Sequence, residues 1–225
     1  MNNERGLAII EAVKSDGIVD VTKDLTEIII DGNLSDGIMK DIPVINIAHS
    51  LYKIGKGVSD YYYLRKLISF LSEIGITSSV EREKFITKLS NSSDELAKAG
   101  NTISHWLSQL DDESKASIMG KLYKGCIEEQ FDYETLQRLC AVVNKIFISD
   151  LLVGLGQLKA NMTIDSIYID GLLSSGLIRI NGISWSTGSD FGEVGSNTEE
   201  SFTCNGSSTN YGITEIGKIM SEVLF

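Results

Sequence analysis

The residues of this chain that could do chemistry are few and scattered along the sequence. The two histidines, His49 and His105, have no neighbouring residues at metal-ligand spacing. Cys126 and Cys140 fall on two consecutive expected helices, where packing in the core is favoured over a redox pair. Cys204 makes the number of cysteines odd, which is typical of reduced thiols. We therefore predict no metal site, no cofactor and no catalytic residue.

Two short motifs suggest ligand sites, but the first lacks required residues and the second has a structural explanation. Gly55-Lys56-Gly57 lacks the earlier glycine of a phosphate-binding Walker loop, because Ser50 stands there, and Gly57 replaces the required Ser or Thr. The run Asp111-Asp112-Glu113 suggests a cation site, but the helix dipole favours acids in a first helical turn. An enzyme whose site is assembled from distant carboxylates remains an alternative to the leading prediction, a protein that is not an enzyme.

One segment reverses the charge of the chain. The 20 basic and 31 acidic side chains give a net charge of −11, whereas residues 53–66 contain four basic residues and one acid, Asp60, a local charge of +3. A basic, aromatic amphipathic helix can contact an anionic membrane surface or an acidic partner. It can also be a core helix whose lysines extend to the surface. The predicted binding residues are Lys53, Lys56, Tyr61, Tyr62, Tyr63, Arg65 and Lys66.

Apolar spacing predicts that residues 1–150 are helical. A single proline in 225 residues also favours long helices over a barrel or sandwich with many tight turns. Pro43 suits the first turn of a kinked helix or helix pair over 43–74. The inward stripe of its second half is Tyr61, Leu64, Ile68 and Leu71. The other expected helices cover 3–14, 22–31, 79–90, 93–110, the segment after Glu113, and the segment from Asp132 to about 148.

Helix starts carry local signals. Ser78 and Glu81 have the spacing of a capping box, in which each residue's side chain binds the other's backbone N–H. Ser92 and Glu95 repeat the spacing before the next helix. Asp132 is expected to cap the helix that follows it. An antiparallel helical array is the arrangement expected for such closely connected helices.

The pattern changes after about residue 150. Thr163 is expected to cap a helix over 164–174, and Gly176 to end it. Strand-like runs flank Asn181-Gly182, a dipeptide typical of tight hairpin turns. Residues 186–210 are rich in Gly, Ser, Thr and Asn and are expected to be mostly loop, with a short strand over 201–204.

The order of these elements resembles a winged-helix module over residues 160–225. The matching motifs are Leu172-Leu173-Ser174-Ser175-Gly176-Leu177-Ile178 at a helix end, a hairpin, and Tyr211-Gly212-Ile213-Thr214-Glu215-Ile216-Gly217-Lys218, where Thr214 caps the last helix. Winged helices usually bind DNA. Here the wing is long and irregular, and residues 180–217 contain no Lys or Arg. Because phosphate contacts supply most non-specific affinity, nucleic acid is disfavoured as a partner.

The chain also resembles Abi-alpha-type bacterial abortive-infection proteins. The residues that carry this resemblance are Leu173-Ser174-Ser175-Gly176-Leu177-Ile178, Gly212-Ile213-Thr214-Glu215-Ile216-Gly217 and Asp41-Ile42-Pro43-Val44-Ile45. The resemblance implies a role in phage defence and transfers no catalytic residue.

The predicted fold is mainly α, with a helical domain over 1–150 and a winged-helix-like module with a long Gly/Ser-rich wing over 151–225. The predicted function is that of a non-enzymatic bacterial defence or stress protein, acting through a protein partner, a homo-oligomer or membrane contact of the 43–74 region. A DNA-binding transcriptional regulator is the alternative. The polar start predicts no secretion signal, and no apolar run approaches the roughly 20 residues of a membrane span. A cytoplasmic protein, with or without peripheral membrane contact, is therefore expected.

Overall fold

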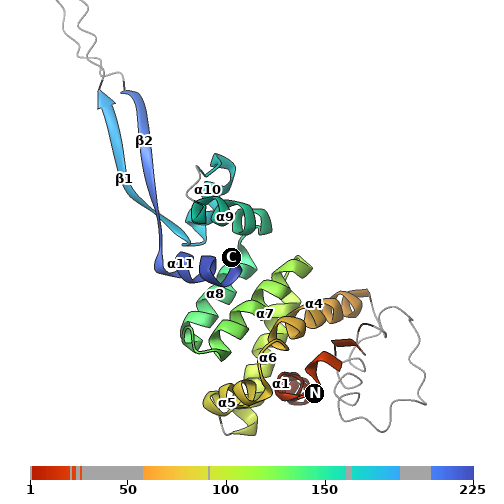
Figure 1. Cartoon of the computed structure of the whole chain (residues 1–225). Helices are drawn as coiled ribbons and strands as arrows, with labels where there is room; N and C mark the ends of the chain where they lie inside the picture. Colours follow the sequence, from red (N-terminus) through yellow and green to blue (C-terminus); the bar gives the residue numbers. More distant parts are fainter. Residues whose placement is uncertain are drawn as a thin grey trace, which may run out of the picture.

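The computed structural model describes residues 2–20, 22, 23, 26, 58–90, 92–160, 164–187 and 204–225. This part of the chain is mainly helical and contains one two-stranded sheet, which confirms the predicted fold class at that level. Figure 1 shows the arrangement. The elements are α1 (Asn2–Lys14), α4 (Val58–Ile74), α5 (Ser79–Leu89), α6 (Ser93–Gln109), α7 (Glu113–Ile127), α8 (Tyr133–Lys145), the π-helical turn η1 (Asp150–Gly154), α9 (Leu155–Lys159), α10 (Ser166–Ser174), β1 (Ile178–Thr187), β2 (Cys204–Ile213) and α11 (Glu215–Leu224).

Helices α1 and α6 touch backbone to backbone. A Cβ placed on Gly100 of α6 would lie 1.9 Å from the carbonyl oxygen of Gly6 in α1, and one on Gly6 would lie 2.1 Å from the carbonyl oxygen of Ala97. Only glycine permits this approach. The two helices therefore share the closest seam of the array.

Helix α4 packs along α7 in a similar way. A Cβ on Gly120 of α7 would lie 2.6 Å from the carbonyl oxygen of Phe70 in α4. The Phe70 ring is fully buried and meets the Tyr123 ring edge to face at 5.1 Å between centroids. The predicted inward stripe of α4 is wrong at Tyr61, which is 41% exposed. The buried face instead runs through Tyr63, Leu64, Leu67, Phe70, Leu71 and Ile74.

Local signals at helix starts are mostly confirmed. Ser78 and Glu81 form the predicted capping box, and Asp132 accepts a hydrogen bond from the Thr135 N–H at 2.8 Å. The second predicted capping box is wrong: Ser92 precedes α6 but makes no side-chain cap. The Glu95 carboxylate instead accepts a hydrogen bond from the Ser90 hydroxyl, which competes for the group that the box requires.

A buried arginine joins three segments. The Arg82 side chain in α5 is 2% exposed and donates to backbone carbonyls at the end of α1, from Nε to Val13 at 2.8 Å and from Nη2 to Ser15 at 2.7 Å. Its Nη1 donates to the carbonyl of Thr77, after α4. Helix ends leave carbonyls without intrahelical donors. Arg82 supplies such donors at the end of α1 from a side chain that is almost fully buried.

The C-terminal elements begin at η1. Helix α10 starts at Ser166 with Asp165 at the cap position, and the predicted cap Thr163 lies outside the described residues. Gly176 ends α10 as predicted, with φ of 77°, a left-handed conformation that glycine adopts without strain. Thr214 caps α11 through the Gly217 N–H at 3.1 Å, as predicted.

The sheet differs from the prediction. Asn181-Gly182 is not a hairpin turn: both residues lie within β1, which pairs with β2 in antiparallel register from Ile178 opposite Ile213 to Thr187 opposite Cys204. The register shifts between Ile180 and Gly182, so Asn181 is the extra residue of a bulge. The expected loop over 186–210 is correspondingly wrong at both ends. Figure 1 shows the hairpin extending away from the helices, with α11 at its base.

One apolar core passes from the helical array into the C-terminal elements. Buried Leu139 and Val143 of α8 belong to the same cluster as Leu151, Leu172 and Met220. Helix α11 contacts both α7 and α8. The division of the chain near residue 150 stays a prediction. Of the other expected helices, 22–31 and the first half of 43–74 lie largely outside the described residues.

Candidate functional site

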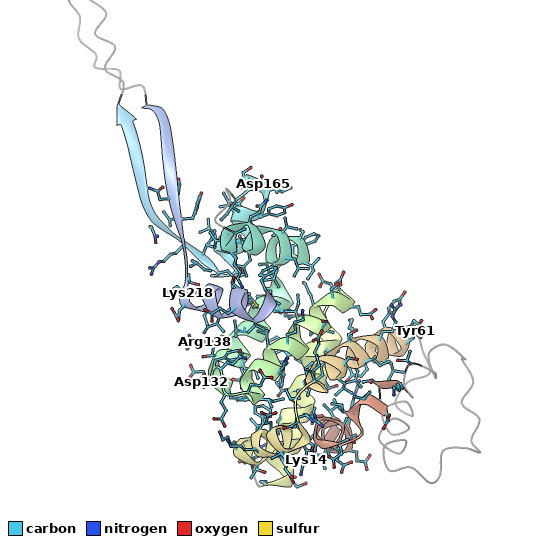
Figure 2. The ribbon with its side chains drawn as sticks, in the orientation of Figure 1. Lys14, Tyr61, Asp132, Arg138, Asp165 and Lys218 are labelled. Carbon is cyan, nitrogen blue, oxygen red and sulfur yellow. The ribbon has the colours of Figure 1, made fainter. Side chains whose placement is uncertain are left out.

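The predicted binding segment has two exposed aromatic residues at the start of α4. Tyr61 is 41% exposed and Tyr62 is 57% exposed, and their rings meet edge to face at 5.8 Å between centroids. Figure 2 shows Tyr61 pointing away from the helical body. Lys53 and Lys56 lie outside the described residues.

Tyr63 faces the interior. Its hydroxyl donates to Ser104 Oγ of α6 at 3.0 Å, and the Arg5 guanidinium of α1 lies 4.4 Å from its ring centroid. With 8% exposure, the ring joins three helices of the array. Of the three predicted tyrosines, the structure therefore presents two on the surface and packs the third.

The described cations of this segment bind the end of α6 and the start of α7. Arg65 pairs with the Glu113 carboxylate at 2.8 Å, and Lys66 donates to the carbonyl of Leu110. Ser69 also donates to Glu113, at 3.1 Å. A membrane or partner that used these two cations would compete with contacts inside the protein.

The two described thiols, Cys126 and Cys140, are buried. Burial raises the pKa of the Cys126 thiol to about 11 and raises the pKa of Cys140 well above its usual range. A thiol that stays protonated at neutral pH is a poor nucleophile. His105 is exposed on α6 beside Trp106, and His49 lies outside the described residues. No cluster of three or more metal-ligating side chains occurs in the part of the chain that the structure describes.

In the part of the chain that the structure describes, each carboxylate with a shifted pKa has it lowered. Hydrogen bonds from Lys84 and Lys88 lower the pKa of Glu129 to about 2, and a hydrogen bond from Lys115 lowers the pKa of Asp111. The Thr135 backbone N–H lowers the pKa of Asp132. A general acid needs a raised carboxyl pKa. These groups act as ion-pair and cap acceptors.

A groove lies between α5 and the turn from α7 to α8. Its volume is about 410 Å³ and its walls are aromatic, with Cys126 at one side and charged groups at the rim. Glu129 holds a left-handed backbone at φ of 61° while it pairs with Lys84 at 2.8 Å and Lys88 at 2.5 Å. An ion pair joins Lys88 to Glu129, and Asp132 caps α8, so the rest of the groove wall is mainly apolar.

A second groove lies where α8 and α10 end. Its volume is about 420 Å³, and its lining residues are Ala141, Val142, Lys145, Ile146, Phe147, Asp150, Gly171, Ser174 and Ser175. Asp150 is half-buried, and a Cβ on Gly171 would lie 1.9 Å from its Oδ2. Phe147 stands on the rim, 66% exposed. Among the described residues, neither Asp150 nor Lys145 has an ion-pair partner within 4.0 Å.

Sequence reasoning missed this second groove. Asp150 precedes an apolar run and Phe147 ends a predicted helix, so neither has a motif at recognisable spacing. The groove exists because the last turns of two helices meet, and one of its walls needs glycine at position 171. The π-helical turn at Asp150–Gly154 is the structural signal, since such turns often occur at functional sites.

No described helix is long and apolar enough to span a membrane. Comparisons with protein-family models, with curated proteins and with solved structures find no significant match for this chain.

Proposed function

We propose that this chain is a non-enzymatic bacterial defence or stress protein that acts by binding another protein. The observation that carries the proposal is the pair Tyr61 and Tyr62, which stays exposed at the start of α4 while Arg65 pairs with Glu113 of α7 and Lys66 binds the carbonyl at the end of α6. Tyrosine supplies a large, rigid contact area at low entropic cost, and it is enriched in protein interfaces. The resemblance to Abi-alpha-type proteins supports the defence role.

Protein binding is a better fit than membrane contact. Peripheral helices bind anionic lipid through lysine and arginine on their polar face. In this segment Arg65 and Lys66 already have partners within the protein. The membrane version would therefore depend on Lys53 and Lys56.

A double substitution tests the proposal in cells. Expression of the wild-type chain in a bacterial host should reduce growth or phage yield, and Tyr61→Ser with Tyr62→Ser should abolish that effect without changing the thermal midpoint. Val80→Ser, at a 74% exposed position of α5, is the matched control. A phenotype unchanged by the tyrosine substitutions would remove the proposed surface.

A vesicle experiment distinguishes membrane contact from protein binding. Co-sedimentation with phosphatidylglycerol vesicles should leave the wild-type chain in solution. Binding that disappears when Lys53, Lys56, Arg65 and Lys66 are changed to Glu would assign the segment to the membrane instead.

A DNA-binding regulator is the second candidate, and the element order α10, β1, β2, α11 is the observation in its favour. The winged-helix arrangement would make α10 the recognition helix. That helix and its cap carry Asp165 and Asp170, have no basic residue, and expose Ile167 at 75%. This surface repels phosphate and suits a protein partner. Duplex binding in gel shifts at low ionic strength would favour the regulator.

A further inference from the structure

The groove at the ends of α8 and α10 is lined by one acidic side chain, the half-buried Asp150, and one basic side chain, the exposed Lys145. Among the described residues these two form no ion pair within 4.0 Å, so Asp150 keeps its charge free for a ligand. Val142 and Lys145 belong to the last turn of α8, and Gly171 and Ser174 to the last turn of α10. The carboxyl ends of helices carry partial negative charge, and two such ends converge here. The half-buried Asp150 is the acidic side chain that lines the groove beside these ends.

The position of the Asp150 carboxylate depends on Gly171. Any larger residue at 171 would place its Cβ within 1.9 Å of Asp150 Oδ2 and 2.7 Å of its Cγ. The described contacts of the carboxylate include only a long hydrogen bond from Ser149 Oγ at 3.4 Å.

The apolar wall selects the kind of cation. Val142, Ile146 and the exposed Phe147 ring line the groove beside the carboxylate. A compact hydrated ion would leave that wall uncovered. The side chain of Lys or Arg matches both parts, because its aliphatic stem covers apolar surface and its charged end reaches the carboxylate. Phe147 can also contact the cation through its ring face.

Charge selects the kind of partner. Two copies of a chain with net charge −11 repel each other, whereas a basic segment is attracted to it. A free polyamine would leave the exposed Phe147 uncovered. Building on the protein-binding function proposed above, we propose that this groove receives a lysine or arginine side chain from a basic segment of a partner protein. Asp150 binds the charged end, and Phe147 covers the stem.

The test is binding of a fluorescein-labelled peptide of alternating lysine and leucine to the full chain, measured by fluorescence anisotropy at low and high salt. Charge-assisted hydrogen bonds at partly buried sites support a loss of about tenfold in affinity for Asp150→Asn. Asp170→Asn removes the same charge from an exposed position of α10 outside the groove, and should change affinity by less than about twofold. A glutamate–leucine peptide should not bind.

A second pair of variants keeps the test decisive if Asp150→Asn impairs folding. Phe147→Ser changes a 66% exposed side chain and should weaken peptide binding, whereas Ile167→Ser, at 75% exposure, should not. Equal losses of peptide affinity for Asp150→Asn and Asp170→Asn, or no peptide binding by the wild-type chain, would overturn the proposed role of the groove. So would concentration-dependent dimerisation that Asp150→Asn abolishes, which would assign the groove to a second copy.

The two proposals fail separately. If the tyrosine substitutions abolish the cellular effect while Asp150→Asn leaves the peptide affinity unchanged, the proposed function stands and the groove assignment is wrong. If the peptide binds through Asp150 while expression has no cellular effect, the groove stands and the defence role is wrong.

Discussion

The helical array and the C-terminal hairpin are held by different kinds of contact. In the array, α1 and α6 meet backbone to backbone at Gly6 and Gly100, and Arg82 binds the carbonyls of three residues from two other segments. In the described residues, the hairpin joins the helices near its base, where α10 packs on β1 and the Thr214 N–H donates to the Leu177 carbonyl at 3.0 Å. An isolated two-stranded hairpin is marginally stable in water. The array is therefore a rigid support, and the hairpin is the part whose order depends most on additional contacts.

Hydrogen exchange should show the largest difference between the regions. Amides of β1 beyond the bulge, from Ile183 to Thr187, should exchange about a thousandfold faster than those of α7, because core amides open only with global unfolding. Mass spectrometry of peptides from the exchanging protein measures this. Equal protection would mean that the hairpin has a further partner, such as a strand from another molecule.

Removal of the buried Arg82 guanidinium should give the largest loss of stability in the helical array. Arg82→Ala leaves carbonyls at the ends of α1 and α4 without donors and opens a cavity, so the free energy of unfolding should fall by about 4 kcal/mol. Arg138→Ala breaks an exposed ion pair with Glu134 at 2.7 Å and should change the free energy of unfolding by less than about 0.5 kcal/mol. Urea unfolding compares the two, and equal losses would contradict the role of Arg82.

Two glycines test packing in one region against backbone conformation in the other. Gly100→Ala forces a methyl group against the backbone of Gly6 and should lower the free energy of unfolding by about 3 kcal/mol. Gly176→Ala meets no atom within 4 Å, but its φ of 77° strains any other residue, so about 1 kcal/mol is expected. Thermal and urea unfolding give both values. A larger loss at Gly176 would reverse the comparison.

The smallest expected effect is a pH dependence at the surface of the array. The pKa of Glu129 is lowered from 4.5 to about 2 by hydrogen bonds from Lys84 and Lys88, so its ion pairs stabilise the folded chain above pH 4.5. That contribution is lost as the pH falls toward 2. Glu129→Gln should therefore be less stable than the wild type at pH 7, and the difference should disappear near pH 2.

Glu222→Gln on α11 gives the background for this measurement. High salt should also reduce the difference, since exposed charges are screened. A difference between Glu129→Gln and the wild type that persists at pH 2 would show that another contact of Glu129 is responsible.

Features of the fold that depend on neighbouring residues could be predicted from the sequence. The caps by Ser78, Asp132 and Thr214 were predictable because each binds a backbone N–H three residues later. The failed box at Ser92 shows the limit, because Ser90 competes for the same Glu95. Asn181-Gly182 has the composition of a turn, yet pairing of β1 with β2 outweighs that local preference and absorbs the extra residue as a bulge.

The surface of the molecule was less predictable. Four basic residues near residue 60 indicated a positive patch, but ion pairing depends on residues such as Glu113 that are distant in sequence. The separation of Tyr63 from Tyr61 and Tyr62 depends on where α1 and α6 lie. The groove at Asp150 needs the ends of α8 and α10, at Lys145 and Ser174, to meet, and neither end has a periodic signal for that meeting.

The Arg82 contact also determines how the molecule should behave in acid. Its acceptors are backbone carbonyls, which do not titrate, and a guanidinium stays protonated as the pH falls. The caps at Asp112 and Asp132 and the ion pairs of Glu129 depend on carboxylates that become neutral. The capping box of α5 also depends on a carboxylate, Glu81. Because the corner formed by α1 and α5 has the Arg82 contacts in addition, acidification should loosen α7 and α8 first. A compact acid state of this protein should keep that corner as its last ordered part.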